Sequence, residues 1–169
     1  ESSPVLMDLL AYMQVNASIE TFCHLPIGSG YGMSAAALLG TVHALNALYD
    51  FHLSPRECAR IAHRIEVQHQ SGLGDISACQ GGGFAIRKTP GPDGDIMRVI
   101  DTRPIYALTI SPIKTSSVLS SPDMIAQITQ SFPSRIPQNL DDIMSLSREF
   151  AEKSGLISRE IRTVLTACD

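Results

Sequence analysis

The hydrophobic positions near the N-terminus change their spacing close to residue 14. Between residues 5 and 13 they recur every three or four positions, which predicts a helix. Over residues 15–21 they alternate with polar positions, and this period of two predicts a half-buried strand. A glycine-rich loop, residues 26–34, then leads into an apolar run that reaches residue 48. Because this run has little polar character on any side, we expect a buried helix.

A third helix is predicted over residues 54–70. Its start combines Ser54, Pro55 and Glu57, which suit an N-cap, the first helical position and the third position of a capping box. Its apolar side chains recur at helical spacing and comprise Cys58, Ile61, Ala62 and Ile65. A polar stripe lies beside them and comprises His63, Glu66 and Gln70. We therefore expect one face of this helix to be packed, with the polar stripe at its border.

The rest of the chain contains predicted strands first and predicted helices afterwards. A second glycine-rich stretch, residues 71–83, precedes the strands. The strands are expected over residues 84–88, 96–100 and 105–110, with a Pro- and Gly-rich hairpin turn between the first two. Around residues 111–121 the composition shifts to Ser, Thr and Pro, and helices are expected from residue 122, over 140–153 and from 158 onward. This order predicts an α+β fold with two domains, residues 1–110 and 111–169.

Composition and charge narrow the range of partners. Thirteen Lys and Arg against seventeen Asp and Glu give a formal net charge of −4, so no basic excess is present to bind a nucleic acid. Every apolar run is shorter than the roughly eighteen residues that a membrane span needs, and no basic-then-apolar signal opens the chain. The four cysteines lack the paired spacing of zinc sites and disulfide frameworks. We therefore expect free thiols, no membrane partner and a cytoplasmic protein.

The first glycine-rich loop is a candidate anion site, because glycines before a helix expose its unpaired N-terminal amides. Gly28, Gly30 and Gly32 stand at alternate positions directly before the apolar helix. A Walker A loop is excluded, because no Lys is near. The spacing Gly30-x-Gly32-x-x-Ala35 fits a dinucleotide-binding fingerprint, and Asp50 supplies its acidic residue. That residue should end a second strand, however, and the sequence leaves no room for one. A plain tight turn is the structural alternative.

Residues 26–36, Pro-Ile-Gly-Ser-Gly-Tyr-Gly-Met-Ser-Ala-Ala, resemble the phosphate-binding motif P-x-G-x-G-L-G-S-S-A-A of the GHMP small-molecule kinases. Tyr31 and Met33 depart from that motif. An aromatic residue followed by Gly-Met-Ser resembles one branch in particular, the archaeal pantoate kinases. Further blocks similar to that branch lie at residues 62–66, 72–75 and 81–91. Order and spacing agree over residues 24–91, and residues 111–116 resemble the linker into the family's second domain.

The resemblance implies that the backbone amides of residues 28–36 hold the β- and γ-phosphates of ATP. The nucleotide-binding residues would be Pro26, Gly28, Ser29, Gly30, Tyr31, Gly32, Met33, Ser34, Ala35 and Ala36. Ser34 and Glu66 match positions that bind Mg²⁺, and Asp75 matches an aspartate that some members use to take the proton from the acceptor hydroxyl. Glu66 and Asp75 are thus the candidate catalytic residues. Each has a structural alternative: an N-cap for Ser34, a solvated surface position for Glu66, and an N-cap of residues 76–80 for Asp75.

The acceptor implied by the resemblance is pantoate, phosphorylated on its primary hydroxyl during coenzyme A synthesis. A carboxylate substrate calls for a cation, preferably an arginine. Four basic residues are candidates, and the sequence does not choose among them: Arg64, Arg87, Arg103 and Lys114. A zinc site at His63 and His69 is not expected, because their spacing of six does not place them on one helix face.

The resemblance also implies the overall architecture. Residues 1–110 would form most of a ribosomal protein S5 domain 2-like ATP-binding domain, and residues 111–169 the opening of a ferredoxin-like C-terminal domain. Because the family carries further motifs outside this span, we expect the chain to be a central piece of a two-domain kinase that is inactive alone. Two alternatives stay open, namely a kinase for mevalonate, phosphomevalonate or homoserine, and a non-catalytic nucleotide sensor. A homodimer is the expected assembly.

Overall fold

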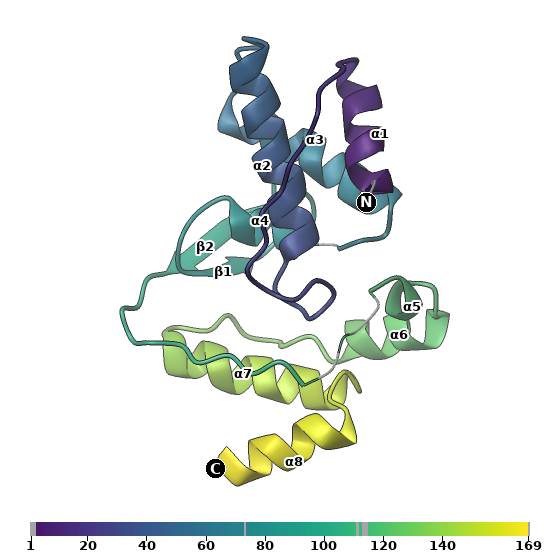
Figure 1. Cartoon of the computed structure of the whole chain (residues 1–169). Helices are drawn as coiled ribbons and strands as arrows, with labels where there is room; N and C mark the ends of the chain where they lie inside the picture. Colours follow the sequence, from purple (N-terminus) through teal and green to yellow (C-terminus); the bar gives the residue numbers. More distant parts are fainter. Residues whose placement is uncertain (1–2, 73, 111, 113–114, 169) are drawn as a thin grey trace. The chain divides into compact units, whose positions relative to one another are not determined.

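The computed structural model describes residues 3–72, 74–110, 112 and 115–168 (Figure 1). They fall into two compact units, Glu1–Ile100 and Asp101–Asp169. The division comes earlier than the domain boundary that the sequence predicts after residue 110. No helix in the described part of the chain is both long enough and apolar enough to cross a membrane.

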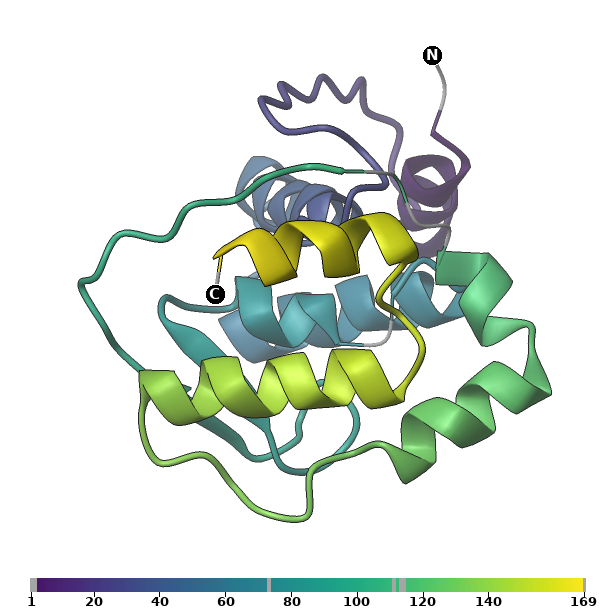
Figure 2. The same ribbon diagram turned by 90° about the horizontal axis from the view of Figure 1, so that it is seen from below.

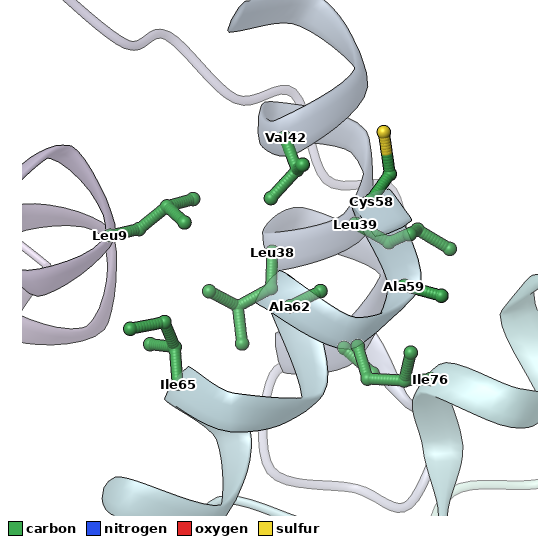
Figure 3. Packing of buried hydrophobic residues seen from close by; sticks show 10 residues of the cluster. Leu9, Leu38, Leu39, Val42, Cys58, Ala59, Ala62, Ile65 and Ile76 are labelled. Carbon is green, nitrogen blue, oxygen red and sulfur yellow. The ribbon is translucent and has the colours of Figure 1, made fainter. Parts of the chain in front are cut away.

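Helices dominate the first unit and enclose its core. These are α1 (Pro4–Met13), α2 (Met33–Leu48), α3 (Pro55–Gln68) and the short α4 (Asp75–Cys79). Figure 3 shows apolar side chains from all four converging on one cluster. Its buried members are Leu9, Ala35, Leu38, Leu39, Val42, Cys58, Ala59, Ala62, Ile65 and Ile76. The apolar stripe predicted for α3 thus contributes directly to this core.

The start of α3 confirms the predicted capping box. The Ser54 hydroxyl accepts a hydrogen bond from the Glu57 amide at 3.3 Å, and the Glu57 carboxylate accepts one from the Ser54 amide at 2.8 Å. Pro55 occupies the first helical position, where its missing N–H costs nothing. The helix ends at Gln68, slightly before the predicted end, and Gln70 adopts a left-handed backbone with φ of 50°.

A two-stranded hairpin completes the first unit. Strands β1 (Phe84–Arg87) and β2 (Ile96–Val99) pair in antiparallel register, with Phe84 opposite Val99 and Arg87 opposite Ile96. Asp93 in the connecting turn forms ion pairs with Arg56 and Arg60 of α3. The predicted hairpin is therefore confirmed, and charged contacts attach its turn to a helix.

Two other predicted strands are not formed. Residues 15–21 keep the predicted alternation, with Val15, Ala17 and Ile19 half-buried between exposed polar residues, yet they belong to no sheet. Residues 105–110 also form no strand, and Tyr106 is 91% exposed. A strand needs a backbone partner for its N–H and C=O groups, and no described segment pairs with either stretch.

The prediction that α2 is a buried helix is correct for only one of its faces. One face of α2 packs into the core, whereas Ala36, Gly40, Ala44 and Leu48 are exposed, the last at 69%. This second face borders a groove of about 610 Å³ whose opposite wall includes residues 17–23. The low polarity of α2 therefore results from two apolar surfaces, of which only one is covered.

In its described residues, the second unit contains four helices, α5 (Thr115–Leu119), α6 (Pro122–Gln130), α7 (Leu140–Lys153) and α8 (Arg159–Cys168). The sequence predicts the last three but not α5. Side chains cap the last three, because Ser121 accepts a bond from Met124 N, Asn139 accepts one from Asp142 N and Ser158 accepts one from Ile161 N. Figure 2 shows the short turn between α7 and α8, which contains Gly155 with φ of 74°. Assignment of this unit to the family's C-terminal domain stays a prediction.

Candidate active site

The glycine-rich loop ends in an N-terminal helix turn without a side-chain cap. Gly28, Gly30 and Gly32 have φ of 77°, 81° and 66°, which is a left-handed backbone that glycine adopts without strain. Gly32 is the N-cap of α2, and no side chain accepts from the first-turn amides. Those amides and the positive end of the helix dipole therefore suit a bound anion. The sequence alternative that made Ser34 the N-cap is wrong, because α2 begins at Met33 and Ser34 lies within its first turn.

The dinucleotide-binding alternative has no structural basis in the described residues. Asp50 follows α2 in a left-handed conformation with φ of 52°, and residues 50–53 contain no strand. The second strand that should present the acidic residue to a ribose is thus missing from this position.

Glu66 is a buried carboxylate on α3. Its side chain is 1% exposed, and its Oε2 lies 3.0 Å from Nδ1 of His63, one helical turn earlier. Burial raises the pKa of Glu66, and the nearby charge of Asp75 also raises it, whereas the hydrogen bond to His63 lowers it. The alternative that Glu66 is a solvated surface residue is therefore wrong. A buried carboxylate of this kind stabilises a nearby cation by its charge.

Asp75 stands where the loop, α3 and α4 meet. It is the first residue of α4 and is exposed, and Gly74 is the N-cap, so the alternative of Asp75 as N-cap is wrong. A Cβ atom on Gly32 would lie 3.7 Å from the Asp75 Cβ. The Asp75 side chain therefore approaches the last glycine of the loop before α2.

Gly72 brings the two acidic side chains together. A Cβ atom at this position would lie 2.6 Å from Glu66 Oε1 and 3.2 Å from Asp75 Oδ2. Both carboxylates therefore approach one backbone position that only glycine leaves open. Three separate sequence blocks, the loop, the Glu66 helix and the Gly72–Asp75 turn, thus converge on one place in the fold. The sequence alone gave no reason to assign Gly72 this role.

The remaining loop positions do not all face this place. Ala35 is 1% exposed and belongs to the hydrophobic core. Met33, Ser34 and Ala36 border the groove beside residues 17–23. The core position of Ala35 explains why a small residue is needed there. At this position, the backbone amide is therefore the group that is left to bind a ligand.

The four candidate cations lie in different surroundings. Arg87 of β1 approaches Gly74, where a Cβ atom would lie 3.2 Å from Nη2, and its charge lowers the pKa of Glu66. Arg64 stacks over the Tyr12 ring at 5.1 Å from its centroid. Arg103, in the second unit, forms ion pairs with two aspartates. Lys114 lies outside the described residues.

A metal ion at this site would depend on ligands from outside the chain. In the part of the chain that the structure describes, no three His, Cys, Asp or Glu side chains are grouped so as to hold a metal. Mg²⁺ needs only one or two carboxylates when substrate phosphates complete its shell. Glu66 is an oxygen donor of the required kind and lies at this site, so it is compatible with a phosphate-bound Mg²⁺. The Ser34 hydroxyl is a second oxygen donor at the start of α2, but it borders the groove beside residues 17–23, and no described contact joins it to Glu66.

Comparison with known proteins shows the family of the chain. Residues 5–83 match the GHMP kinases N terminal domain. The pantoate kinase of Methanospirillum hungatei JF-1 is 98% identical over 169 residues, which is 100% of this chain and 58% of that protein. The pantoate kinase of Thermococcus kodakarensis is 31% identical over 85% of this chain and 50% of that protein.

A solved structure has a similar fold. It is described as a phosphotransferase related to the coenzyme A biosynthesis pathway, and it matches with a TM-score of 0.55 and 28% identity over 83% of this chain and 48% of that chain. The chain thus spans about half the length of the relatives it matches. With its glycine loop, its converging carboxylates and these matches, the chain belongs to the GHMP kinase family, and residues 5–83 carry the N-terminal domain of that family.

Proposed function

We propose that the chain is the nucleotide-binding part of an ATP-dependent kinase that phosphorylates the primary hydroxyl of pantoate to give 4-phosphopantoate. The observation that carries the proposal is the approach of Glu66 and Asp75 to one position at Gly72, with Asp75 also beside Gly32 at the start of α2. Near-identity to a pantoate kinase over the whole chain supports pantoate as the acceptor. Phosphoryl transfer needs little covalent help from a protein, so positioning and charge carry most of the catalysis.

The loop and the first turn of α2 would bind the phosphates of ATP. Its left-handed glycines keep side chains away from the ligand, and uncapped amides at the helix start donate to phosphate oxygens. The nucleotide-binding residues are therefore proposed to be those of the loop, residues 26–36, with backbone groups making most of the contacts.

Glu66 and Ser34 would bind the Mg²⁺ that accompanies ATP. When bound, the ion supplies positive charge that offsets the charge of the phosphates. Glu66 is 1% exposed, and the charge of a buried carboxylate is costly without a counter-charge. A cation beside Glu66 would stabilise the ionised form that burial disfavours. His63 would hold the carboxylate in one orientation through the 3.0 Å contact.

Asp75 would accept the proton from the acceptor hydroxyl. It is exposed, and its side chain lies near the glycine that precedes α2, where an added Cβ would be 3.7 Å from the Asp75 Cβ. A general base must lie within hydrogen-bonding reach of the proton that it removes, and this position is next to the proposed phosphate site.

Arg87 would bind the carboxylate of pantoate. Of the three candidate cations that lie in the described part of the chain, Arg87 is the one beside the turn that carries Asp75. An arginine can bind both oxygens of a carboxylate at once, which orients the acceptor as well as attracting it. Replacing Arg87 by Met should raise the KM for pantoate much more than the KM for ATP.

The decisive experiment is an ADP-release assay with pantoate, mevalonate and homoserine as acceptors. It uses the complete Methanospirillum hungatei protein, with residues numbered as in this chain. Pantoate-dependent ADP release is expected, and release with mevalonate or homoserine alone would replace the proposed acceptor. The variant Glu66→Gln separates a kinase from a nucleotide sensor, because a kinase loses turnover and a sensor only loses Mg-ATP affinity. Glu20→Gln, an exposed change of the same kind, is the control.

The proposed compartment rests on the state of the cysteines. Cys23, Cys58 and Cys79 are free thiols, which is usual in the reducing cytoplasm. A cytoplasmic homodimer is the proposed state. Light scattering on the purified protein would test the dimer.

A further inference from the structure

Arg98 connects strand β2 to helix α4 through its guanidinium group. Nη2 donates a 2.7 Å hydrogen bond to the carbonyl oxygen of Ser77. Nη1 donates to three further carbonyl oxygens at 3.0 to 3.5 Å, those of Gly81, Gly82 and Ala78. One side chain therefore holds the C-terminal end of α4 and the segment that follows it.

Helix α4 depends on contacts of this kind for its position. It contains five residues, and a helix so short is not stable by itself in water. The fully buried Ile76 anchors its N-terminal end in the core. The carbonyls at its other end lack intrahelical partners, and a cation is favoured there by charge-assisted bonds and by the helix dipole. Arg98 thus anchors the end that the core does not reach.

The run of glycines at residues 81–83 makes room for this arrangement. A Cβ atom on Gly81 would lie 3.3 Å from both Cζ and Nε of Arg98, so the guanidinium lies against bare backbone. Gly83 has a φ of 76°, and a Cβ there would lie 2.6 Å from the carbonyl oxygen of Val99. The glycines therefore seat Arg98 and let the chain enter β1 close to β2.

We propose that Arg98 is a positioning residue that fixes α4 so that Asp75 lies beside Gly32 and Glu66. The inference rests on the proposed role of Asp75 in the kinase reaction. Asp75 and the Arg98 contacts lie at opposite ends of a helix only about 7 Å long. Releasing one end of so short a helix therefore moves the other end relative to the glycine loop.

The test compares Arg98→Met and Arg98→Lys in the complete Methanospirillum hungatei protein. Arg98→Met is expected to lower kcat by about tenfold to a hundredfold, as a misplacement of about 1 Å does. The KM for ATP should change little, because the hydrogen bonds that Arg98 makes among the described residues go to α4 and the segment after it and not to the glycine loop. Arg98→Lys is expected to recover part of kcat, since an ammonium group reaches fewer of the carbonyls. Arg56→Met is the control. It removes one of the two cations that pair with Asp93, and the ion pair between Asp93 and Arg60 is kept.

A double-mutant cycle with Asp75→Asn decides whether Arg98 acts through Asp75. In the Asp75→Asn background, Arg98→Met should cause no further loss of kcat. Losses that multiply, or a kcat that Arg98→Met leaves unchanged, would overturn the inference. If Asp75→Asn itself leaves kcat unchanged, the proposed role of Asp75 fails, and the inference fails with it for that separate reason.

Amide hydrogen exchange tests the inference without an activity assay, and it does not require Arg98→Met to fold. In a folded Arg98→Lys variant, the amides of residues 75–79 should exchange faster than in the parent, whereas those of α3 should not change. Equal exchange in α4 would show that Arg98 does not fix this helix and would refute the inference.

Discussion

Replacing Gly72 by Ala tests the convergence of the two carboxylates most directly. The new Cβ would lie 2.6 Å from Glu66 Oε1 and 3.2 Å from Asp75 Oδ2. Ordinary van der Waals contact begins at 3.4 Å, so Glu66 Oε1 must move by about 0.8 Å. Glu66 cannot simply turn into solvent, because its side chain is 1% exposed and is held by His63. The substitution therefore displaces the proposed magnesium ligand and presses against the proposed base.

The expected effect is large for one methyl group. A displacement of about 1 Å at a reacting site lowers the rate by about a hundredfold, which corresponds to about 2.7 kcal/mol of activation free energy. Crowding a filled site also lowers the free energy of unfolding by about 1 to 3 kcal/mol. The backbone of Gly72 is not in the left-handed region, so neither effect arises from φ strain.

The measurement is kcat against Mg²⁺ concentration in the complete Methanospirillum hungatei protein, with urea unfolding of the same variant. Gly40→Ala is the matched control, because a Cβ on Gly40 meets nothing within 4 Å in the middle of α2. Ala is favoured over Gly there by up to about 1 kcal/mol. If Gly72→Ala keeps the parent kcat and magnesium dependence, the two carboxylates do not form the site in the way described.

Three further predictions follow from individual side chains. Replacing His63 by Leu should raise the Mg²⁺ concentration needed for half-maximal rate by about tenfold or more. His63→Gln, which keeps a hydrogen-bonding group, should cause a smaller increase. Equal increases in the two variants would contradict the role of His63 in orienting Glu66. Burial and the charges of neighbouring carboxylates raise the pKa of Cys79. Asp75→Asn should therefore lower that pKa and speed alkylation of Cys79 at pH 8, as followed by peptide mass spectrometry. An unchanged alkylation rate would show that the charge of Asp75 does not act on Cys79. In the second unit, the bond from Arg135 lowers the pKa of Asp142 from 3.8 to about 2, so the stabilisation is complete above pH 4 and is lost as the pH falls through 2. Urea unfolding at pH 2 to 5 should show a smaller loss of stability in Asp142→Asn than in the parent chain, because only the Asp142 contribution is removed; equal losses would contradict the prediction.

Local signals in the sequence predicted most of the elements correctly. The capping box at Ser54 and the Pro- and Gly-rich turn between β1 and β2 depend on neighbours along the chain, and both are present in the structure. Residues 15–21 and 105–110 have the pattern of strands but form none. Pattern indicates which side of a strand is apolar, whereas pairing requires a partner from elsewhere in the fold.

The sequence by itself determined the glycine loop before α2, the polar stripe of α3 and the acidic turn at Asp75 as separate motifs. Only the tertiary structure decided that these motifs meet, that Glu66 is buried, and that Arg87 rather than Arg64 lies beside the turn with Asp75. It also assigned close neighbours to Gly72 and Gly81, whose sequence blocks resemble the family without indicating which side chains lie against them. The physical reason is that spacing along a chain fixes local geometry, while burial, pKa shifts and close approach depend on atoms that come from distant segments.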